Sequence, residues 1–358
     1  MRIFYAADAS PNPDFASNLW RANLHDSLVA LGHEVIEFRY DLAATFRHLD
    51  PARAEHAAFI AENRPRLSAA LLAQIRAAHA AAPLTLFFSY FYDACVEPAT
   101  LDAIRALGIV TVNWFCNASY QLHLVREISP HYDWCLVPEH FRLADYRALG
   151  ARPIYCQEAA NPAIYHPHAL PLAYDIAFIG QCYADRPDIV RWLRSQSLDV
   201  RVWGANWDSQ ITPPSRNPLR RLFQKASGLP AHIVGGVLTD TALVQLYSRA
   251  RIQLGFATVG ETHASGQRIT QVRLRDFEVP MSGAFYLTEH SHELAEFFTP
   301  GIEIETWHTR EELRDKCRYY LAHDDARRRI AAAGRERALR EHTWQHRFTA
   351  AFHAMGIA

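Results

Sequence analysis

The sequence lacks the long apolar runs and the charge bias that would place it in several large classes of protein. No uninterrupted apolar run reaches the roughly 18 to 20 residues that a membrane-spanning helix needs. The formal net charge is −1, whereas proteins that bind nucleic acid are usually strongly basic. The N-terminal stretch has neither the apolar core nor the cleavage site of a secretory signal. We therefore expect a cytoplasmic protein with no nucleic-acid partner and no stable insertion into a membrane.

The cysteines and histidines are not spaced as in a metal site. The six cysteines form no C-x-x-C pair, and most lie in or beside apolar stretches, which predicts buried thiols in the reduced state. None of the nineteen histidines belongs to an H-E-x-x-H motif, and no D-x-D motif occurs. The pairs His166/His168 and His290/His292 lie in loop-like sequence. We expect no metal and no cofactor.

Short apolar stretches alternate with helical stretches along the first half of the chain. Helices are predicted over residues 18–31 and 51–80, the second with a break at Pro65. The strand-like stretches are residues 2–6, 34–39, 84–90, 109–114 and 134–138. Strands alternating with helices predict an α/β fold with a parallel, doubly wound sheet.

A Pro- and His-rich segment, residues 161–172, interrupts this pattern and is typical of a stiff linker. A second alternation follows it, and the last part, from Arg310 onward, is helical with an interruption at Gly334. We predict an N-terminal Rossmann-like domain over 1–165, a C-terminal one over 172–340, and a final helix over 341–358 that packs back on the first domain. Ligands should bind between the two domains, at the carboxyl ends of the strands.

The segment 255–288 holds the most informative polar residues. A strand is followed by a loop with two glycines and then by a helix that carries Arg273, Arg275 and Glu278. Glycines before a helix let backbone amides approach an anion, and the helix N-terminus adds partial positive charge. Arg275 and Glu278 can face the same side and could bind the phosphate and ribose of a nucleotide. An ion pair on a solvated helix surface explains the same spacing.

Residues 275–307 (RDFEVPMSGAFYLTEHSHELAEFFTPGIEIETW) resemble the characteristic block of the CgeB-like, or spore-maturation-protein-like, glycosyltransferases. Residues 311–348 resemble the helical end of that family, and YDIAFIGQCYADR, VWGANW and LVQLYSRARIQLGF resemble its earlier elements. The resemblance covers most of residues 174–348. It implies a GT-B architecture, in which two Rossmann-like domains face each other across a cleft, and an enzyme that transfers a sugar from a nucleotide-diphosphate donor.

The resemblance also implies roles for individual residues. Glu278 would bind the donor's ribose, Gly283 would allow close packing beside it, and Arg275 and Arg186 would face the diphosphate without a metal. UDP is the favoured nucleotide, and the acceptor, a protein, glycan or small molecule, stays open. Related retaining enzymes carry a further Glu where this chain has Thr270, so the stereochemical outcome also stays open. The remaining expected donor-binding residues are Gly180, Glu261, His263, Gly266, Gln267 and Arg273.

Loops after the strands of the first half supply candidates for the acceptor side. Asp93 could act as a general base if the reaction inverts, or it could be a cap or turn residue. For the aromatic candidates Tyr92 and Trp114, packing in the core is the alternative to contact with a sugar. The acceptor-side candidates are Asp8, Tyr92, Trp114 and Asn117.

Two other functions fit the same pattern. A nucleotide-sugar epimerase could share the double-Rossmann body, and a degenerate relative could bind a nucleotide without turning it over. A dinucleotide-dependent dehydrogenase is disfavoured, because no G-x-G-x-x-G follows the first strand.

Overall fold

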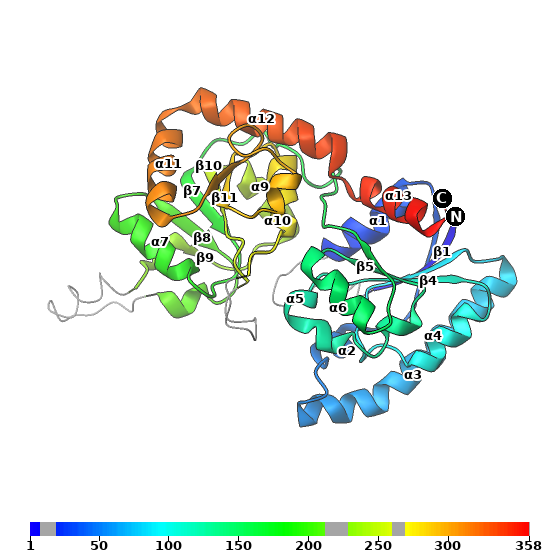
Figure 1. Ribbon diagram of the computed structural model, residues 1–358. Helices are drawn as coiled ribbons and strands as arrows, with labels where there is room; N and C mark the ends of the chain where they lie inside the picture. The colour runs from blue at the N-terminus through cyan, green and yellow to red at the C-terminus, as the bar shows by residue number, and fades with distance from the viewer. Residues whose placement is uncertain (8–18, 212–227, 260–268, 358) are drawn as a thin grey trace. The chain divides into compact units, whose positions relative to one another are not determined.

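The chain folds into two compact units. A computed structural model describes residues 1–7, 19–211, 228–259 and 269–357. Of these, the first unit contains residues 1–7, 19–158 and 344–357, and the second contains residues 159–211, 228–259 and 269–343. The chain therefore leaves the first unit after residue 158 and returns to it for its last helix (Figure 1).

The first unit is built on six parallel strands in the order β2-β1-β3-β4-β5-β6. The two central strands β3 and β4 are almost wholly buried, as expected of a parallel sheet that is covered on both faces. The strands are β1 (Arg2–Ala6), β2 (Glu34–Glu37), β3 (Leu86–Ser89), β4 (Val110–Trp114), β5 (Trp134–Val137) and β6 (Pro153–Tyr155).

The last helix of the chain belongs to this first unit. In α13 (Trp344–Met355), Trp344 and Phe348 are fully buried. The Trp344 ring lies 5.3 Å from that of Trp114, and the Phe348 ring lies 5.6 Å from that of Phe88. The other helices of the unit are η1 (Arg21–His25), α1 (Asp26–Ala30), α2 (Ala43–Arg47), α3 (Ala54–Ala81), α4 (Pro98–Arg105), α5 (Ala118–Gln121), η2 (Leu122–Leu124), η3 (Ser129–His131), η4 (His140–Arg142) and α6 (Leu143–Ala148).

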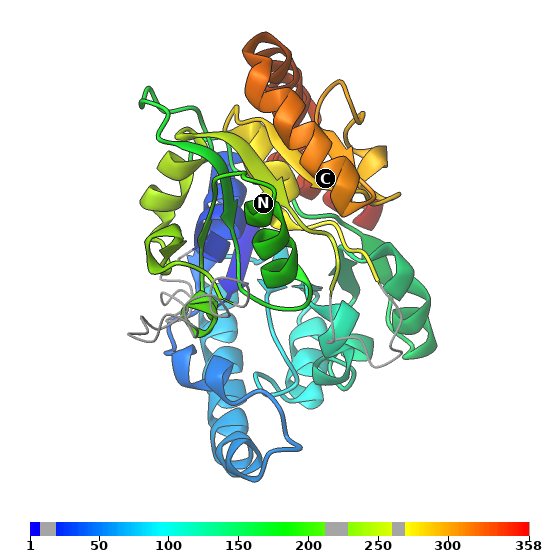
Figure 2. The same cartoon turned by 90° about the vertical axis from the view of Figure 1, so that its left-hand side faces the viewer.

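Helix α3 runs unbroken through Pro65, where the sequence predicted a break (lower part of Figures 1 and 2). A proline inside a helix costs about 3 kcal/mol. Contacts just before the proline anchor the helix, because Asn63 donates to Thr45 Oγ1 at 2.9 Å and Arg64 Nη2 donates to the Val96 carbonyl at 2.8 Å. Leu67, in the following turn, is fully buried.

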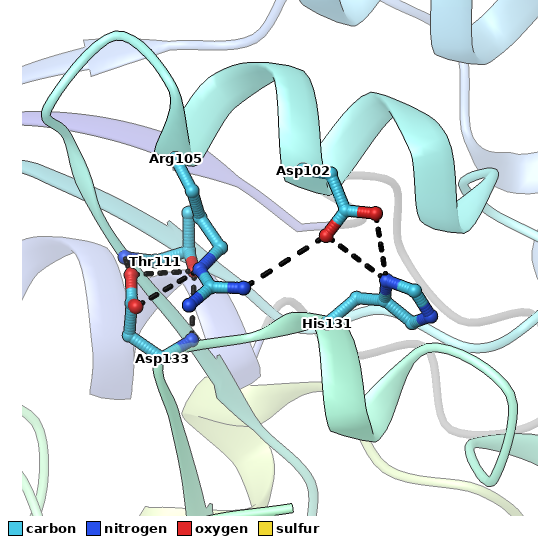
Figure 3. A network of polar contacts seen from close by, with 5 residues as sticks. All are labelled: Asp102, Arg105, Thr111, His131 and Asp133. Carbon is cyan, nitrogen blue, oxygen red and sulfur yellow. Dashed lines mark hydrogen bonds and ion pairs between the residues drawn. The ribbon is translucent and has the colours of Figure 1, made fainter.

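A polar network fixes the amino ends of β4 and β5 against α4 (Figure 3). Asp133 Oδ2 accepts from the Thr111 backbone amide at 2.9 Å and from the Thr111 hydroxyl at 3.1 Å. Arg105 Nε donates to the other Asp133 oxygen at 2.9 Å, and His131 lies 3.0 Å from Asp102. These polar groups satisfy one another at the edge of the sheet opposite its loop-bearing carboxyl ends.

The second unit has six parallel strands in the order β12-β11-β10-β7-β8-β9. This is the strand order of a Rossmann fold, whose direction of winding reverses between the first and fourth strands, here β7 and β10. The predicted α/β architecture with two Rossmann-like halves is thus confirmed. The strands are β7 (Tyr174–Ile179), β8 (Val200–Trp203), β9 (Val234–Gly235), β10 (Ala250–Gly255), β11 (Tyr286–Glu289) and β12 (Glu305–Trp307).

Helices cover both faces of this sheet. Figure 1 shows α7 and α11 on one side and α9 and α10 on the other. Val190 of α7 and Leu313 of α11 pack with Ile176 and Val202 in the core. The helices are α7 (Arg186–Ser195), η5 (Trp207–Gln210), η6 (Ala231–Ile233), α9 (Asp240–Tyr247), α10 (Leu274–Met281), η8 (Leu294–Glu296), α11 (Arg310–Ala322) and α12 (Asp324–Glu341).

The predicted interruption at Gly334 is wrong, since α12 continues through it. The glycine instead allows close packing: a Cβ at this position would overlap the carbonyl oxygen of Glu303. None of the six cysteines forms a disulfide and all are buried, as predicted. Among the described helices, none is both long and apolar enough to cross a bilayer.

Candidate anion-binding site

The carboxyl end of β7 leads directly to a buried arginine. The chain turns after Ile179 and enters α7 at Arg186, which is 5% exposed. Its guanidinium donates to the Gln181 carbonyl at 2.9 Å and to the Tyr183 hydroxyl at 2.7 Å. It also lies over the Tyr183 ring, 3.8 Å from the centroid. These contacts use neutral groups, and no acidic side chain in the described part of the chain forms an ion pair with this guanidinium.

Two further arginines come from the segment between β10 and α10. Arg273 is the N-cap of α10, and its guanidinium donates to the carbonyls of Phe256 at 3.2 Å and Thr258 at 3.0 Å. Arg275 lies in the first turn of α10, and its Nε is buried without an acceptor within the described chain. The three arginines thus reach the point between β7 and β10 where the winding of the sheet reverses.

The charges of these arginines act on one another. Burial, together with the positive charges of Arg273 and Arg275, lowers the pKa of Arg186 to about 9. At neutral pH the group still carries its proton. None of the three guanidinium groups forms an ion pair with a described acidic residue. Arg186 is buried and Arg273 and Arg275 are half-buried. Three guanidinium groups in such surroundings, with no direct ion pair to a described residue, are an arrangement that a bound anion would stabilise.

Glu278 faces inward and is held by two tyrosines. The side chain is 2% exposed. Its Oε1 accepts from the Tyr165 hydroxyl at 2.7 Å and its Oε2 accepts from the Tyr247 hydroxyl at 2.9 Å. Burial raises the pKa of Glu278, while Arg275 and the two hydroxyls oppose this rise. The alternative of a solvated surface ion pair with Arg275 is therefore wrong, and the expected ribose contact stays a prediction.

The two predicted glycines serve the packing of the second unit. Gly283 has φ +69° just beyond the end of α10, and a Cβ there would lie 2.9 Å from Pro167. The Gly180 carbonyl accepts from the Trp207 indole at 2.7 Å. A Cβ on Gly180 would lie 2.6 Å from the Phe178 ring. The structure places no other role on either residue.

Four of the expected donor-binding residues, Glu261, His263, Gly266 and Gln267, lie outside the described residues. Thr270, which stands where related retaining enzymes carry a Glu, pairs with Thr258 in an antiparallel bridge. In the described chain no group of three His, Cys, Asp or Glu side chains is arranged to hold a metal ion.

The surroundings of the acceptor-side candidates favour structural roles over contact with an acceptor. Trp114 is fully buried beside Trp20, at 4.7 Å between ring centroids, so it is corrected to a core residue with no surface for a sugar. Tyr92 is 5% exposed, and its hydroxyl lies 3.4 Å from that of Tyr90. Asn117 precedes α5, half-buried, and accepts from the Tyr120 hydroxyl at 3.0 Å. Asp8 lies outside the described residues.

Asp93 is engaged by the backbone. Its two carboxylate oxygens accept from the amides of Ile128 at 3.1 Å and Glu127 at 3.3 Å. Burial raises the pKa of Asp93 to about 6, against the effect of these two hydrogen bonds. This geometry is that of a turn residue that anchors a neighbouring loop, which was the alternative to a general base.

Sequence reasoning missed the residues that support the arginines. Tyr183 stacks on Arg186, Tyr165 and Tyr247 hold Glu278, and Glu289 binds the backbone after β10. Only Tyr183 could have been found, because it lies three residues before Arg186 in the same loop. The other three are brought to the site by the fold from distant parts of the chain.

Two Rossmann-like units in one chain are the architecture of the GT-B class of fold, and comparison with known proteins agrees. The model of a family described as "Glycosyl transferase-like" matches residues 186–353, which include all three arginines. No curated protein matches the chain in sequence.

Several solved structures share the architecture over nearly the whole chain. Sucrose-phosphate synthase from Thermosynechococcus elongatus is 15% identical with a TM-score of 0.63, covering 99% of this chain and 98% of its own. HepE from Anabaena, in complex with UDP and glucose, is 11% identical with a TM-score of 0.60, covering 100% of both chains. AviGT4, a glycosyltransferase involved in avilamycin A biosynthesis, is 14% identical with a TM-score of 0.56, covering 98% of this chain and 96% of its own. At these identities the likeness establishes the GT-B fold.

Proposed function

We propose that the protein is a glycosyltransferase that transfers a sugar from a nucleoside-diphosphate donor to an acceptor, without a metal ion. The observation that carries this proposal is the cluster of Arg186, Arg273 and Arg275, which form no ion pair with a described acidic residue. The match of the glycosyl transferase-like family model over the same residues supports it. The resemblance to CgeB-like glycosyltransferases points to the same activity.

The cluster suits the chemistry of this reaction. Transfer breaks the bond between the anomeric carbon of the sugar and an oxygen of the diphosphate, and negative charge grows on the departing nucleotide. Guanidinium groups already fixed around that oxygen stabilise the charge as it develops, which is the most effective form of electrostatic catalysis. Three arginines would neutralise a diphosphate in the place where other enzymes use a divalent cation.

A UDP-sugar is the favoured donor. Structures of HepE from Anabaena, which has the same fold, contain UDP with glucose or UDP-glucose. We therefore propose UDP as the nucleotide and a hexose as the first sugar to test. The acceptor is left open.

Calorimetry with UDP, GDP, dTDP, CDP and ADP tests the proposal, first in EDTA and then with Mg²⁺. We expect one nucleotide to bind in EDTA, with an affinity that falls as salt rises and that is lost in Arg186→Ala. Arg191→Ala is the matched control, because Arg191 lies on the same helix but is paired with Asp188. Binding that requires Mg²⁺ would contradict the metal-independent site, and no binding of any nucleotide would contradict the proposed function.

A further inference from the structure

A buried carboxylate lies next to the backbone segment that holds Arg273. Glu289, the last residue of β11, is 5% exposed. Its Oε2 accepts from the backbone amides of Ala257 at 2.9 Å and Thr258 at 3.0 Å. The Thr258 hydroxyl lies 2.9 Å from Oε1. The carboxylate thus holds two consecutive peptide groups just after the end of β10.

The same short segment holds Arg273 from its other side. The carbonyls of Phe256 and Thr258 accept from the Arg273 guanidinium. The segment is also paired with the chain that leads into α10, because the Gln271 amide donates to the Ala257 carbonyl at 2.9 Å. Residues 256–258 therefore lie between a carboxylate on one side and a guanidinium on the other.

This arrangement transmits the effect of the carboxylate to the arginine. An amide that donates to a charged acceptor polarises its peptide group. The Ala257 amide and the Phe256 carbonyl belong to one peptide group, so Glu289 makes this carbonyl a better acceptor for Arg273. If the carboxylate were removed, two buried amides would lose their acceptor, and the peptide groups would turn to find others. The Phe256 carbonyl, which shares a peptide group with the Ala257 amide and holds the Arg273 guanidinium, would turn with it.

We propose that Glu289 is a positioning residue of the anion site, which fixes the backbone of residues 256–258 so that Arg273 is held beside Arg186. The identity of the anion, a nucleoside diphosphate, rests on the proposed function. The contacts that join Glu289 to Arg273 through the backbone do not depend on it. Glu289 acts through Arg273 and does not itself contact the ligand.

Glu289→Gln tests the proposal, and Glu305→Gln is the matched control. Glu305 is 7% exposed on the neighbouring strand β12, where it accepts from Lys316 at 3.0 Å and from Tyr320. Each change replaces a buried carboxylate by an amide of the same shape. We expect both to lower the melting temperature, but only Glu289→Gln to weaken UDP and pyrophosphate binding, by about tenfold, the effect of losing one well-placed contact.

A double-mutant cycle separates positioning from general destabilisation. If Glu289 acts through Arg273, then Glu289→Gln should have no further effect on pyrophosphate affinity in an Arg273→Ala background. Additive losses, or equal losses of affinity in Glu289→Gln and Glu305→Gln, would overturn the proposal.

The proposal can be tested even if the proposed function fails. If the unaltered protein binds neither UDP nor pyrophosphate, hydrogen exchange on residues 256–259 and 269–273 decides the matter. Faster exchange there in Glu289→Gln, but not in Glu305→Gln, supports the positioning role. Unchanged exchange in Glu289→Gln would overturn it.

Discussion

The three clustered arginines Arg186, Arg273 and Arg275 lower the stability of the folded protein when no anion is bound. Moving a charged group out of water without a partner of opposite charge costs several kcal/mol. Arg186 offsets part of that cost by stacking on Tyr183 and by donating to two neutral oxygens. Arg275 has fewer contacts, and its buried Nε has no acceptor in the described chain. The positive charge of Arg186, which forms no ion pair with a described residue, is best explained by a ligand that supplies the negative charge.

Replacement of Arg275 by alanine should slow turnover without harming the fold. We expect a loss on the order of 10²-fold in kcat, as when other charge-stabilising groups are removed from an active site. The melting temperature should change little, because the variant relieves repulsion of Arg186 but also loses the attraction between Arg275 and Glu278. Steady-state kinetics with the donor found by calorimetry measure the effect, and Arg191→Ala should behave like the unaltered protein. Near-normal turnover in Arg275→Ala would remove this arginine from the catalytic groups.

Glu278 should matter for stability as well as for any contact with the donor. In Glu278→Ala the hydroxyls of Tyr165 and Tyr247 would lose their acceptor in the core. An unsatisfied buried group costs about 1–3 kcal/mol, so we expect the free energy of unfolding to fall by about 3 kcal/mol in urea titrations. Glu278→Gln keeps one acceptor and one donor for the tyrosines and should lose less. A loss below about 0.5 kcal/mol in the alanine variant would show that the tyrosines are satisfied elsewhere.

Among the elements, the strands followed from the sequence more closely than the ends of the helices. Buried parallel strands are short apolar runs, and β1 was predicted with the bounds that the structure shows. Pro65 and Gly334 are helix-breaking residues on local grounds, yet α3 and α12 pass through them. Their effects are overridden by side-chain contacts around α3 and by a close approach of backbone at α12, which no local pattern reveals.

The residues of the candidate site could be predicted from the sequence only where a local motif contains them. Arg186 and Arg275 could be named because the resemblance carries them in recognisable motifs. The bond between Tyr165 and Glu278 could not, because it joins residues 113 positions apart. Spacing on a helix put Glu278 beside Arg275, but only tertiary packing determines that the carboxylate faces two tyrosines.

Gly334→Ala should destabilise the protein, although helix propensity alone predicts the opposite. Alanine is favoured over glycine by about 1 kcal/mol inside a helix. At this position the added methyl would overlap the Glu303 carbonyl, and overpacking of this kind costs about 1–3 kcal/mol. The reverse change in the exposed neighbour, Ala332→Gly, should cost only the propensity term. Urea unfolding compares the two, and a stabilised Gly334→Ala would mean that α12 can move away from residue 303.

At the scale of the whole molecule, the two units have separate cores although the chain passes between them twice. The first unit is completed by α13, whose Phe348 and Phe352 are buried. The proposed anion site lies wholly in the second unit. Damage to one core should therefore leave the other unit intact, because the aromatic contacts of Phe348 are with residues of its own unit.

Phe348→Ala should loosen the first unit alone. Removing a buried phenyl ring costs about 3–5 kcal/mol, so hydrogen exchange in β1, β3 and β4 should accelerate while β7, β8 and β10 stay protected. Nucleotide affinity, measured by calorimetry well below the melting temperature, should be unchanged, since no residue of the arginine cluster comes from the first unit. Phe285→Ala, which removes a buried ring from the core of the second unit, should give the reverse pattern. If Phe348→Ala abolished nucleotide binding while the second unit kept its protection, then the first unit would have to contribute directly to the donor site.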